Sequence, residues 1–303
     1  MEIKAFIADS RAIGEVLSGN IEDYPDGIII PVDKPYRWTS ADVVRKIKWA
    51  ACKHFGKKNL KVGHAGTLDP LATGVLLICV GKATRLAEAL QKEPKEYIAG
   101  IAFGATTPSF DLEKAVDKVY PTDNVSEASV REALSGFLGE RDQVAPLFSA
   151  KSVNGVRAYE LARKQFKDKG LAKTDAIEGF DHSLAETLNV QRINIYELEL
   201  LAFDAGGIVT PGRTRPQRSE NGRGPDGRIN VADTSGLDLK VATVRISCGK
   251  GTYIRALARD LGEALDSGAH LDSLRRTKNG GFDSVAALSV EQVLSLLPVN
   301  NHS

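Results

Sequence analysis

The chain has 303 residues and a net charge of +1, with 42% hydrophobic and 26% charged residues. This composition is that of an ordinary globular protein, and the length suits one large domain or two. No apolar run approaches membrane-spanning length, and no basic segment precedes an apolar stretch near the N-terminus, so we expect neither a membrane span nor a secretory signal. The three cysteines, Cys52, Cys79 and Cys248, form no C-x-x-C pair, which favours reduced thiols and a cytoplasmic protein.

Charge is unevenly distributed along the chain. Residues 41–67 hold seven Lys and Arg against one acid, and residues 239–282 hold eight against four. Residues 1–26 hold six acids and two bases and have weak periodicity, so we interpret them as a polar N-terminal extension. Solvated helix faces alone can produce such unevenness. Basic residues that gather near a candidate site also indicate a phosphate-bearing partner.

The first predicted elements are a buried strand at 28–32 and a helix that begins at Ser40. The apolar residues of this helix recur at helical spacing up to Gly56, and Ser40 is its expected N-cap. A second strand is expected at 75–80, followed by a short amphipathic helix at 83–92.

A further strand is predicted at 95–103, where alternation places Tyr97 on one face with three apolar residues. Alternation alone favours an ordinary core tyrosine. The rest of the chain predicts helices at 126–137, 156–167, 252–266 and 289–297, and strands at 146–153 and within 186–203 and 239–247. Strands and helices mix without a regular βαβ rhythm, which predicts an α+β fold with a mixed sheet.

Residues 205–236 differ from the rest of the chain. Five arginines and several Gly- and Pro-containing turn pairs lie there, with almost nothing apolar to bury. Such a stretch cannot offset the entropy lost on ordering it, so we predict a mobile, solvated insertion. A flexible basic arm for RNA is the alternative role.

Residues 63–74 read Gly-His-Ala-Gly-Thr-Leu-Asp-Pro-Leu-Ala-Thr-Gly and place one carboxylate, Asp69, just before the apolar run 75–80. Pro70 favours extended backbone at Asp69, and three glycines permit turns that residues with a Cβ resist. A carboxylate in a stiff loop at the mouth of a strand is well placed for chemistry, although a lone Asp-Pro is more often a simple turn. His64 lies five residues from Asp69, but no third ligand at supporting spacing indicates a metal site.

Residues 247–262 form a second informative segment, in which two glycines allow a strand to turn into a helix. Thr252 is the expected cap of that helix, and Arg255 lies in its first turn, where the helix dipole disfavours a cation. We expect Asp69 to supply the compensating anion, because an Arg–carboxylate pair can be bidentate and keeps the acid ionised. An ordinary surface acid is the alternative partner. A nucleotide-triphosphate loop is disfavoured, because Lys250 is followed by Gly rather than Ser or Thr.

These two segments resemble motifs II and III of the TruB family of tRNA pseudouridine synthases. Further segments are similar to the family in the same order, with 30–40 as its first motif, 95–97 as its lysine-to-tyrosine strand, 146–163 as its central segment and 268–277 as its closing segment. The resemblance implies the pseudouridine synthase fold, in which a mixed, largely antiparallel sheet is flanked by helices and carries a central catalytic cleft. It also implies a single catalytic domain over residues 27–303.

The resemblance implies an enzyme that converts uridine 55 in the T arm of tRNA to pseudouridine. Asp69 would initiate cleavage of the N-glycosidic bond, after which the uracil turns and rejoins the ribose through C5. Whether the aspartate attacks the base, attacks the sugar or removes a sugar proton stays open. Arg255 would hold Asp69 and steer the flipped nucleotide. Tyr97 would stack on the target base and could act in the late removal of the C5 proton.

The resemblance also implies a set of substrate-binding residues. Tyr253 and Leu274 would line the uracil pocket, although Leu274 by itself reads as plain core. His64 would enter the T loop and stabilise the extruded nucleotide. Lys34 and Lys151 would support the site or touch phosphate.

No cofactor or metal is expected, because the isomerisation needs none and the sequence shows no motif for one. The expected partner is tRNA, bound by a monomer with no obligate protein partner and no membrane. Two departures from the family concern RNA contacts. Many bacterial members carry a C-terminal RNA-binding domain of the PUA type, whereas here only a short helix and residues 298–303 follow the match, which implies the type without that domain. The family's T-D-T-x-D segment falls at 106–111 and keeps only its last acid, Asp111, which leaves the contacts there open.

Two other functions stay open from the sequence. A related synthase that acts on another RNA or another uridine would use identical chemistry, although the segment around His64 favours the standard substrate. An RNA-binding or RNA-folding factor that keeps the scaffold without turnover is disfavoured by the intact Asp69, Tyr97 and Arg255.

Overall fold

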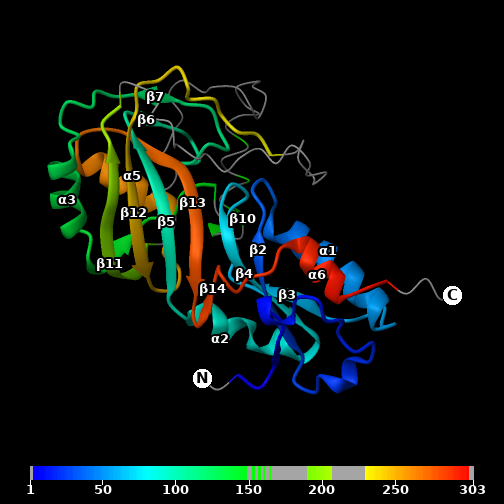
Figure 1. The fold of residues 1–303 in the computed structure, drawn as a ribbon. Coiled ribbons are helices and arrows are strands. Elements are labelled where there is room, and N and C mark those ends of the chain that lie inside the picture. Colours follow the sequence, from blue (N-terminus) through cyan, green and yellow to red (C-terminus); the bar gives the residue numbers. More distant parts are fainter. Residues whose placement is uncertain are drawn as a thin grey trace. The chain divides into compact units, whose positions relative to one another are not determined.

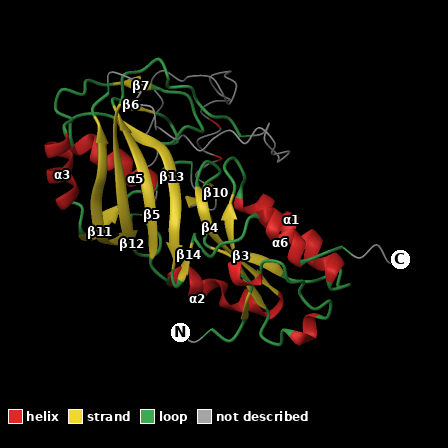
Figure 2. Cartoon of the chain, in the orientation of Figure 1, coloured by secondary structure: helices red, strands yellow, loops and turns green. Residues whose placement is uncertain are grey.

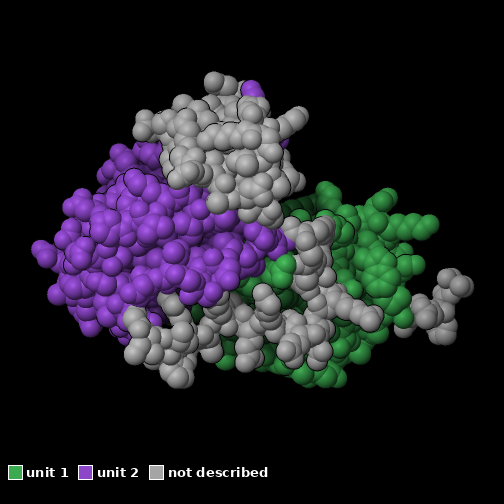
Figure 3. Space-filling view, turned by 90° about the horizontal axis from the view of Figure 1, so that it is seen from above, with its two compact units in different colours: residues 1–96, 221–226, 275–303 green, residues 97–220, 227–274 purple. Residues whose placement is uncertain are grey.

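The structure is a computed structural model that describes residues 3–148, 152–153, 156–157, 160, 164, 190–206 and 229–299 (Figure 1). The chain divides into two compact units, which Figure 3 distinguishes by colour. Unit 1 comprises residues 1–96, 221–226 and 275–303, and unit 2 comprises residues 97–220 and 227–274. Strands β5 (Lys95–Phe103) and β13 (Ala269–Asn279) contribute residues to both.

Unit 1 is organised around strand β4 (Thr73–Val80), whose residues after Thr73 are all buried. Strand β2 (Ile28–Lys34) pairs with it antiparallel along one edge. The other edge pairs with β3 (Val62–Ala65), antiparallel, and with the C-terminal part of β13, parallel. The remaining strands of the unit are β1 (Phe6–Ile7), parallel to β2, and β14 (Phe282–Asp283), antiparallel to β13. The predicted strands at 28–32 and 75–80 are confirmed.

The helices of unit 1 predicted from Ser40, at 83–92 and at 289–297 lie close to these positions, whereas the two short 3-10 helices before residue 24 were not predicted. In chain order the helices are η1 (Ser10–Ala12), η2 (Ile21–Asp23), α1 (Ser40–His54), η3 (Gly81–Leu86), α2 (Ala87–Lys92) and α6 (Val290–Leu296). Figure 2 shows α1 and α6 as neighbours. The N-cap of α1 is Thr39 and not Ser40, because the Thr39 and Asp42 side chains bond each other's backbone N–H groups in a capping box. The helix expected at 83–92 is a 3-10 helix up to Leu86 and an α-helix after it.

The core of unit 1 includes Ile29, Val75, Leu77 and Cys79, which are all fully buried. Burial raises the pKa of the Cys79 thiol to about 11, which keeps it protonated and consistent with a packing role. The N-terminal segment also contributes buried residues to this unit, at Ala5, Ala8, Ala12, Leu17 and Ile21. Three of the five are alanines, and Phe6, Ile13 and Val16 between them are apolar but exposed, which is why the sequence shows so little periodicity there.

Unit 2 contains a sheet in the order β13, β5, β12 (Lys240–Cys248), β11 (Gln191–Asp204) and β8 (Gly139–Gln143). Figure 1 shows β11, β12, β5 and β13 running side by side. The β12–β11 and β11–β8 pairs are antiparallel. Its other elements whose bounds fall within the described residues are β6 (Ala105–Thr106) with β7 (Lys118–Val119), β9 (Ser152–Val153) with β10 (Val156–Arg157), and helices α3 (Glu127–Ser135) and α5 (Ile254–Ala264).

The α+β prediction with a mixed, largely antiparallel sheet is confirmed. Two local predictions differ from the structure. Val156–Arg157 forms a strand at the start of the expected 156–167 helix, whereas Glu160 and Lys164 within that range are helical. The described part of 146–153 is a strand only at Ser152–Val153. Most of the remaining 158–167 segment and most of the 205–236 insertion lie outside the described residues. No helix in the described part of the chain combines the length and apolar character needed to cross a membrane.

Candidate active site

Asp69 lies half-buried in the loop between β3 and β4 of unit 1, and side chains from other elements hold its neighbours on both sides. The Ser40 hydroxyl, at the start of α1, accepts a hydrogen bond from Leu68 N at 2.9 Å and donates one to Leu68 O at 3.1 Å. On the other side, Lys34 Nζ at the end of β2 donates to Pro70 O at 3.1 Å. The backbone that carries Asp69 is therefore fixed immediately before and after the carboxylate.

Arg276 on β13 holds the start and the end of the same loop. Its side chain is almost completely buried, at 1% exposure. Its Nε donates to Val75 O at 2.7 Å, and its Nη2 and Nη1 donate to Gly66 O at 3.0 Å and Thr67 O at 3.5 Å. Gly74 permits this approach, because a Cβ there would lie 2.1 Å from Arg276 O and the backbone φ is +97°.

Lys34 is a buried cation beside Asp69. Its Nζ donates to three carbonyl oxygens, of Pro35 at 2.9 Å, Trp38 at 2.6 Å and Pro70 at 3.1 Å. These acceptors use all three N–H bonds of the ammonium form. Burial lowers the pKa of Lys34 to about 7, while the negative charge of Asp69 acts to raise it. The side chain has no exposed surface, which favours support of the loop over contact with a phosphate.

His64 lies on β3, the strand that leads into the Asp69 loop, and it is half-buried. Its Nδ1 is buried without a hydrogen-bond partner among the described residues. Burial, and then the charge of Arg276, lower the pKa of His64, so the imidazole is neutral at pH 7. The described residues contain no group of three His, Cys, Asp or Glu side chains that could hold a metal ion.

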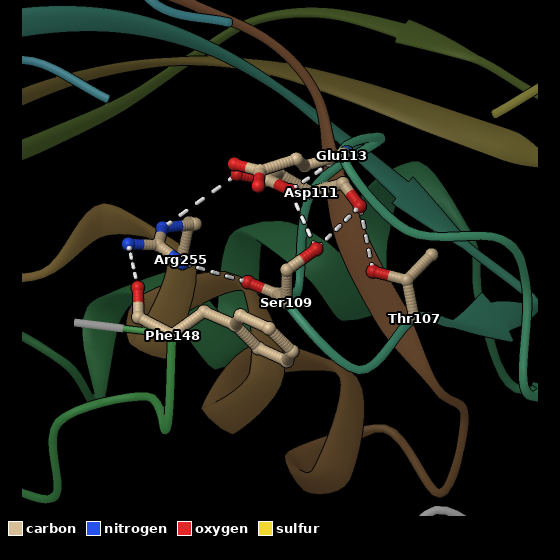
Figure 4. A network of polar contacts seen from close by, with 6 residues as sticks. All are labelled: Thr107, Ser109, Asp111, Glu113, Phe148 and Arg255. Carbon is tan, nitrogen blue, oxygen red and sulfur yellow. Dashed lines mark hydrogen bonds and ion pairs between the residues drawn. The ribbon is translucent and has the colours of Figure 1, made fainter. Parts of the chain in front are cut away.

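Arg255 of unit 2 lies in the first turn of α5, and its guanidinium is fixed from three directions (Figure 4). Its Nη1 donates to Ser109 O at 3.0 Å and its Nη2 to Phe148 O at 2.9 Å. Its Nε lies 3.8 Å from Asp111 Oδ2, in an ion pair whose side chains are 5% and 7% exposed. These contacts give the guanidinium one orientation.

Asp111 is itself held in place by the segment around it. Its Oδ1 accepts hydrogen bonds from Ser109 Oγ at 2.6 Å and from Glu113 N at 2.9 Å. Thr107 Oγ1 donates to Asp111 O at 2.7 Å (Figure 4). Asp111, the last acid of the 106–111 segment, thus supplies a buried negative charge to Arg255. Because it is buried, Asp111 differs from an ordinary surface acid.

Tyr253 is the N-cap of α5 and is half-buried. The buried Gln143 side chain bonds both ends of this residue, accepting from Tyr253 N at 2.8 Å and donating to Tyr253 O at 3.1 Å. Thr252 was the expected cap and this is wrong, because its hydroxyl donates back to Gly249 O at 3.0 Å.

Comparison with known proteins identifies the family. Residues 53–183 match the model of the TruB family pseudouridylate synthase N-terminal domain, and residues 255–302 match that of the tRNA pseudouridylate synthase B C-terminal domain. The tRNA pseudouridine synthase B of Phocaeicola vulgatus is 44% identical over 270 residues, which cover 89% of this chain and 92% of the relative. The chain belongs to the TruB family of pseudouridylate synthases.

Other TruB proteins and solved structures agree with this assignment. The tRNA pseudouridine synthases B of Parabacteroides distasonis and Deinococcus radiodurans are 40% and 35% identical, over 92% and 88% of this chain and 96% and 78% of theirs. A crystal structure of a Cbf5-Nop10-Gar1 complex is similar with a TM-score of 0.55 and 24% identity, over 91% of this chain and 56% of the other. A structure of an H/ACA RNP bound to a substrate RNA containing 2'-deoxyuridine is similar with a TM-score of 0.52 and 20% identity, over 97% of this chain and 65% of the other. This TruB chain thus spans about 56% and 65% of those two chains, and the likeness confirms the pseudouridine synthase fold.

The predicted site residues of this TruB protein divide between the two units. Unit 1 brings Lys34 close enough to Asp69 for their charges to interact, and it places His64 on the strand before the same loop. The other predicted residues described by the structure, all in unit 2, are Arg255, Tyr253, Tyr97 and Leu274, of which Tyr97 and Leu274 are 8% and 9% exposed. Lys151 lies outside the described residues. The Asp69–Arg255 pair joins residues of different units and stays a prediction.

Sequence reasoning missed three residues that hold the site, namely Ser40, Arg276 and Asp111. Arg276 belongs to the segment at 268–277 that resembles the TruB family, but no role was assigned to it from the sequence. Ser40 was interpreted as a helix cap, although its hydroxyl bonds Leu68 instead. The contacts of Asp111 were left open because its segment departs from the family pattern.

Proposed function

We propose that this TruB protein converts uridine 55 in the T arm of tRNA to pseudouridine. The relatives named tRNA pseudouridine synthase B, at 35% to 44% identity over most of the chain, support tRNA as the substrate. The observation that carries the proposal is the Asp69 loop, in which Ser40, Lys34 and Arg276 fix the backbone around one half-buried carboxylate. Such fixation is what a group that must meet an extruded nucleotide requires.

The reaction is a rearrangement without net oxidation. The target uridine must first leave the stack, which costs a few kcal/mol that protein–RNA contacts offset. Asp69 then initiates cleavage of the bond between N1 of uracil and C1′ of ribose. The uracil turns, C5 bonds to C1′, C5 loses its proton and N1 gains one. Product and substrate therefore have the same atoms, and no step calls for an electron donor or acceptor.

We assign the remaining residues to positioning and binding. Arg255, oriented by Ser109 O, Phe148 O and Asp111, pairs with Asp69 and steers the flipped nucleotide. Tyr97 stacks on the target base and serves in the removal of the C5 proton. The remaining assignments are Tyr253 and Leu274 to the walls of the uracil pocket, neutral His64 to the T loop, and Lys151 to phosphate.

We also propose the simplest cellular setting for this activity. The enzyme acts in the cytoplasm as a monomer on tRNA, without an obligate protein partner, and residues 27–303 form one catalytic domain. Because the net charge of the chain is only +1, local basic clusters attract the RNA, and the chain as a whole does not.

The proposal is tested by incubating the protein with an unmodified tRNA transcript and mapping every pseudouridine formed. We expect a single product at position 55. A product at another position would assign the same chemistry to another uridine. Binding of the transcript without any product would favour the RNA-folding factor and overturn the proposal.

A further inference from the structure

Unit 1 contains a basic pocket at the opposite end of β4 from the Asp69 loop. It has a volume of about 540 Å³, within the range of ligand sites in proteins. Three segments line it, at 21–24, 57–61 and 81–85. Four lysines and one arginine line this pocket against a single acid, Glu22; the cations are Lys57, Lys58, Lys61, Lys82 and Arg85.

The cations converge because the backbone holds their segments together. Gly81 N donates to Lys61 O at 2.8 Å, and Val62 pairs with Val80 in the β3–β4 ladder. Lys61 carries the acceptor of this hydrogen bond, and Lys82 directly follows the residue that donates it. The bond therefore brings together two lysines that are 21 positions apart in the chain. The basic character of the pocket is thus fixed by the sheet and does not depend on a chance overlap of mobile side chains.

Glu22 is ion-paired with one of the five cations, and the charge of a second, Lys82, also acts on it. It forms an ion pair with Lys57 at 2.5 Å, and the hydrogen bond from Lys57 lowers the pKa of Glu22. Among the described residues, no carboxylate lies within ion-pair distance of Lys58, Lys61, Lys82 or Arg85. Like charges gathered in one hollow repel one another, and a bound anion relieves that repulsion.

The pocket is remote from the catalytic aspartate. Strand β4 separates the Asp69 loop from Gly81, and its eight residues span about 23 Å from Thr73 to Val80. A nucleotide that reacts at Asp69 therefore does not occupy this pocket. A longer polyanion that passes both places would contact each with a different part of its backbone.

The lining indicates what kind of anion fits. All five cations are exposed, as expected of groups that meet a phosphate backbone at the surface. Tyr24 contributes an aromatic wall and is anchored by a hydrogen bond of 2.9 Å from Ser18 N to its hydroxyl. An aromatic ring beside a basic groove is a combination found in nucleic-acid channels. The buried residues of the lining, Ile21 and Leu60, are apolar and offer no group that would read a base.

We propose that this pocket is a second phosphate-binding site, which holds backbone phosphates of the RNA substrate away from the reacting uridine. The proposal rests on the proposed function in that RNA is the ligand. It assigns Lys58, Lys61 and Lys82 as the phosphate contacts. Lysine recognises phosphate as a point charge, so arginine at these positions preserves the site.

The test compares two triple variants that each remove three exposed lysine charges from unit 1. One is Lys58→Ala/Lys61→Ala/Lys82→Ala in the pocket, and the matched control is Lys46→Ala/Lys48→Ala/Lys53→Ala on α1, outside the pocket. Binding of an unmodified tRNA transcript is measured over a range of salt concentrations. We expect the pocket variant to lose roughly tenfold or more in affinity and about two to three units of salt slope, since each phosphate contact contributes about one unit.

The corresponding Lys→Arg triple variant in the pocket should bind tRNA as the wild type does. Equal losses in both alanine triples would show a general charge effect and overturn the proposal, and so would wild-type binding by the pocket variant. A separate arm titrates inorganic phosphate against chloride at equal ionic strength and follows thermal unfolding. Saturable stabilisation by phosphate that is lost in the pocket variant, with tRNA binding unchanged, would assign the pocket to a small free anion and overturn the RNA assignment.

Failure of the proposed function is recognised separately. Binding is measured without turnover, so a wild-type protein that binds tRNA but forms no pseudouridine refutes the catalytic assignment alone. The pocket comparison then still decides whether these lysines hold RNA.

Discussion

The guanidinium of Arg276 donates a hydrogen bond of 3.0 Å to the carbonyl oxygen of Gly66, a residue 210 positions earlier in the chain. Through this contact and the bond to Val75 O, one buried arginine defines where the Asp69 loop leaves β3 and where it enters β4. The loop buries Leu68, Leu71 and Ala72, and the hydrogen bonds from Arg276 add to this packing by fixing its two ends. Five predictions test this arrangement and the roles derived from it.

Asp69→Ala should abolish pseudouridine formation on a T-arm transcript and leave RNA binding largely intact, because the carboxylate initiates the chemistry. The control is Asp26→Asn, an exposed aspartate of the same unit, which should retain full activity. Product is measured by mapping modified uridines and binding by filter retention. Substantial turnover by Asp69→Ala would refute the assignment.

Arg276→Met should lower the free energy of unfolding by about 3 kcal/mol, because it leaves buried carbonyl oxygens without donors. It should also lower kcat, since the Asp69 loop loses its hold at both ends. Arg275→Met is the neighbouring control. Arg275 forms a bidentate pair with Asp33 that is 40% and 36% exposed, so its loss should cost about 1 kcal/mol or less.

Urea unfolding and steady-state kinetics measure both effects for Arg276. To separate a local effect on the loop from general instability, kinetics are recorded well below the unfolding midpoint of each variant. Equal behaviour of the two arginine variants would contradict the special role of Arg276.

Lys34 should make stability depend on pH in a defined window. Burial lowers its pKa from 10.5 to about 7 in the folded protein, so between these values the unfolded chain binds more protons. The contribution of Lys34 to the free energy of unfolding therefore rises from about pH 7 to about pH 10.5, by at most about 1.4 kcal/mol per pH unit.

The measurement for Lys34 is urea unfolding of the wild type and Lys34→Met at pH 7, 8 and 9. The wild type should gain stability relative to the variant at each step. Lys46→Met removes an exposed lysine of the same unit. The difference between its free energy of unfolding and that of the wild type should stay constant over this pH range. A difference for Lys34→Met that stays flat or shrinks over this range contradicts the prediction.

Asp111→Asn should lower kcat about tenfold, equivalent to about 1.4 kcal/mol, because Arg255 then loses the buried charge that orients it. KM should change less, since Asp111 acts through Arg255.

Arg255→Ala should cost both turnover and placement of the flipped nucleotide. Asp123→Asn, at an exposed position of the same unit, should behave as the wild type.

Steady-state kinetics and the fluorescence of a base analogue at position 55 follow the two effects of Arg255 and Asp111. An unchanged rate in Arg255→Ala would remove that residue from the site. An Asp111→Asn variant that raised KM alone would assign Asp111 to binding rather than to positioning.

Local sequence patterns predicted the elements that carry the chemistry. The apolar run before Gly81, the helical spacing after Ser40 and the two glycines before Arg255 gave β4, α1 and α5 with small errors at their ends. The N-caps differ by one residue from those expected: Thr39 caps α1 in a capping box, and Tyr253 is the N-cap of α5 without a side-chain hydrogen bond to the helix. Strand β13 was not predicted, because its buried Arg276 removes the apolar alternation by which a strand is recognised.

The sequence by itself determined the family, the α+β class and the identity of the candidate aspartate, since these depend on the order and spacing of residues along the chain. Only the tertiary structure decided what holds that aspartate, because Ser40, Lys34 and Arg276 reach its loop from positions 28 to 210 residues away from their partners. The same holds for the basic pocket, whose cations and aromatic wall come from three separate segments. Hydrogen bonds and charges act over a few ångströms in space, so contacts between distant segments exist only once the sheet has brought them together.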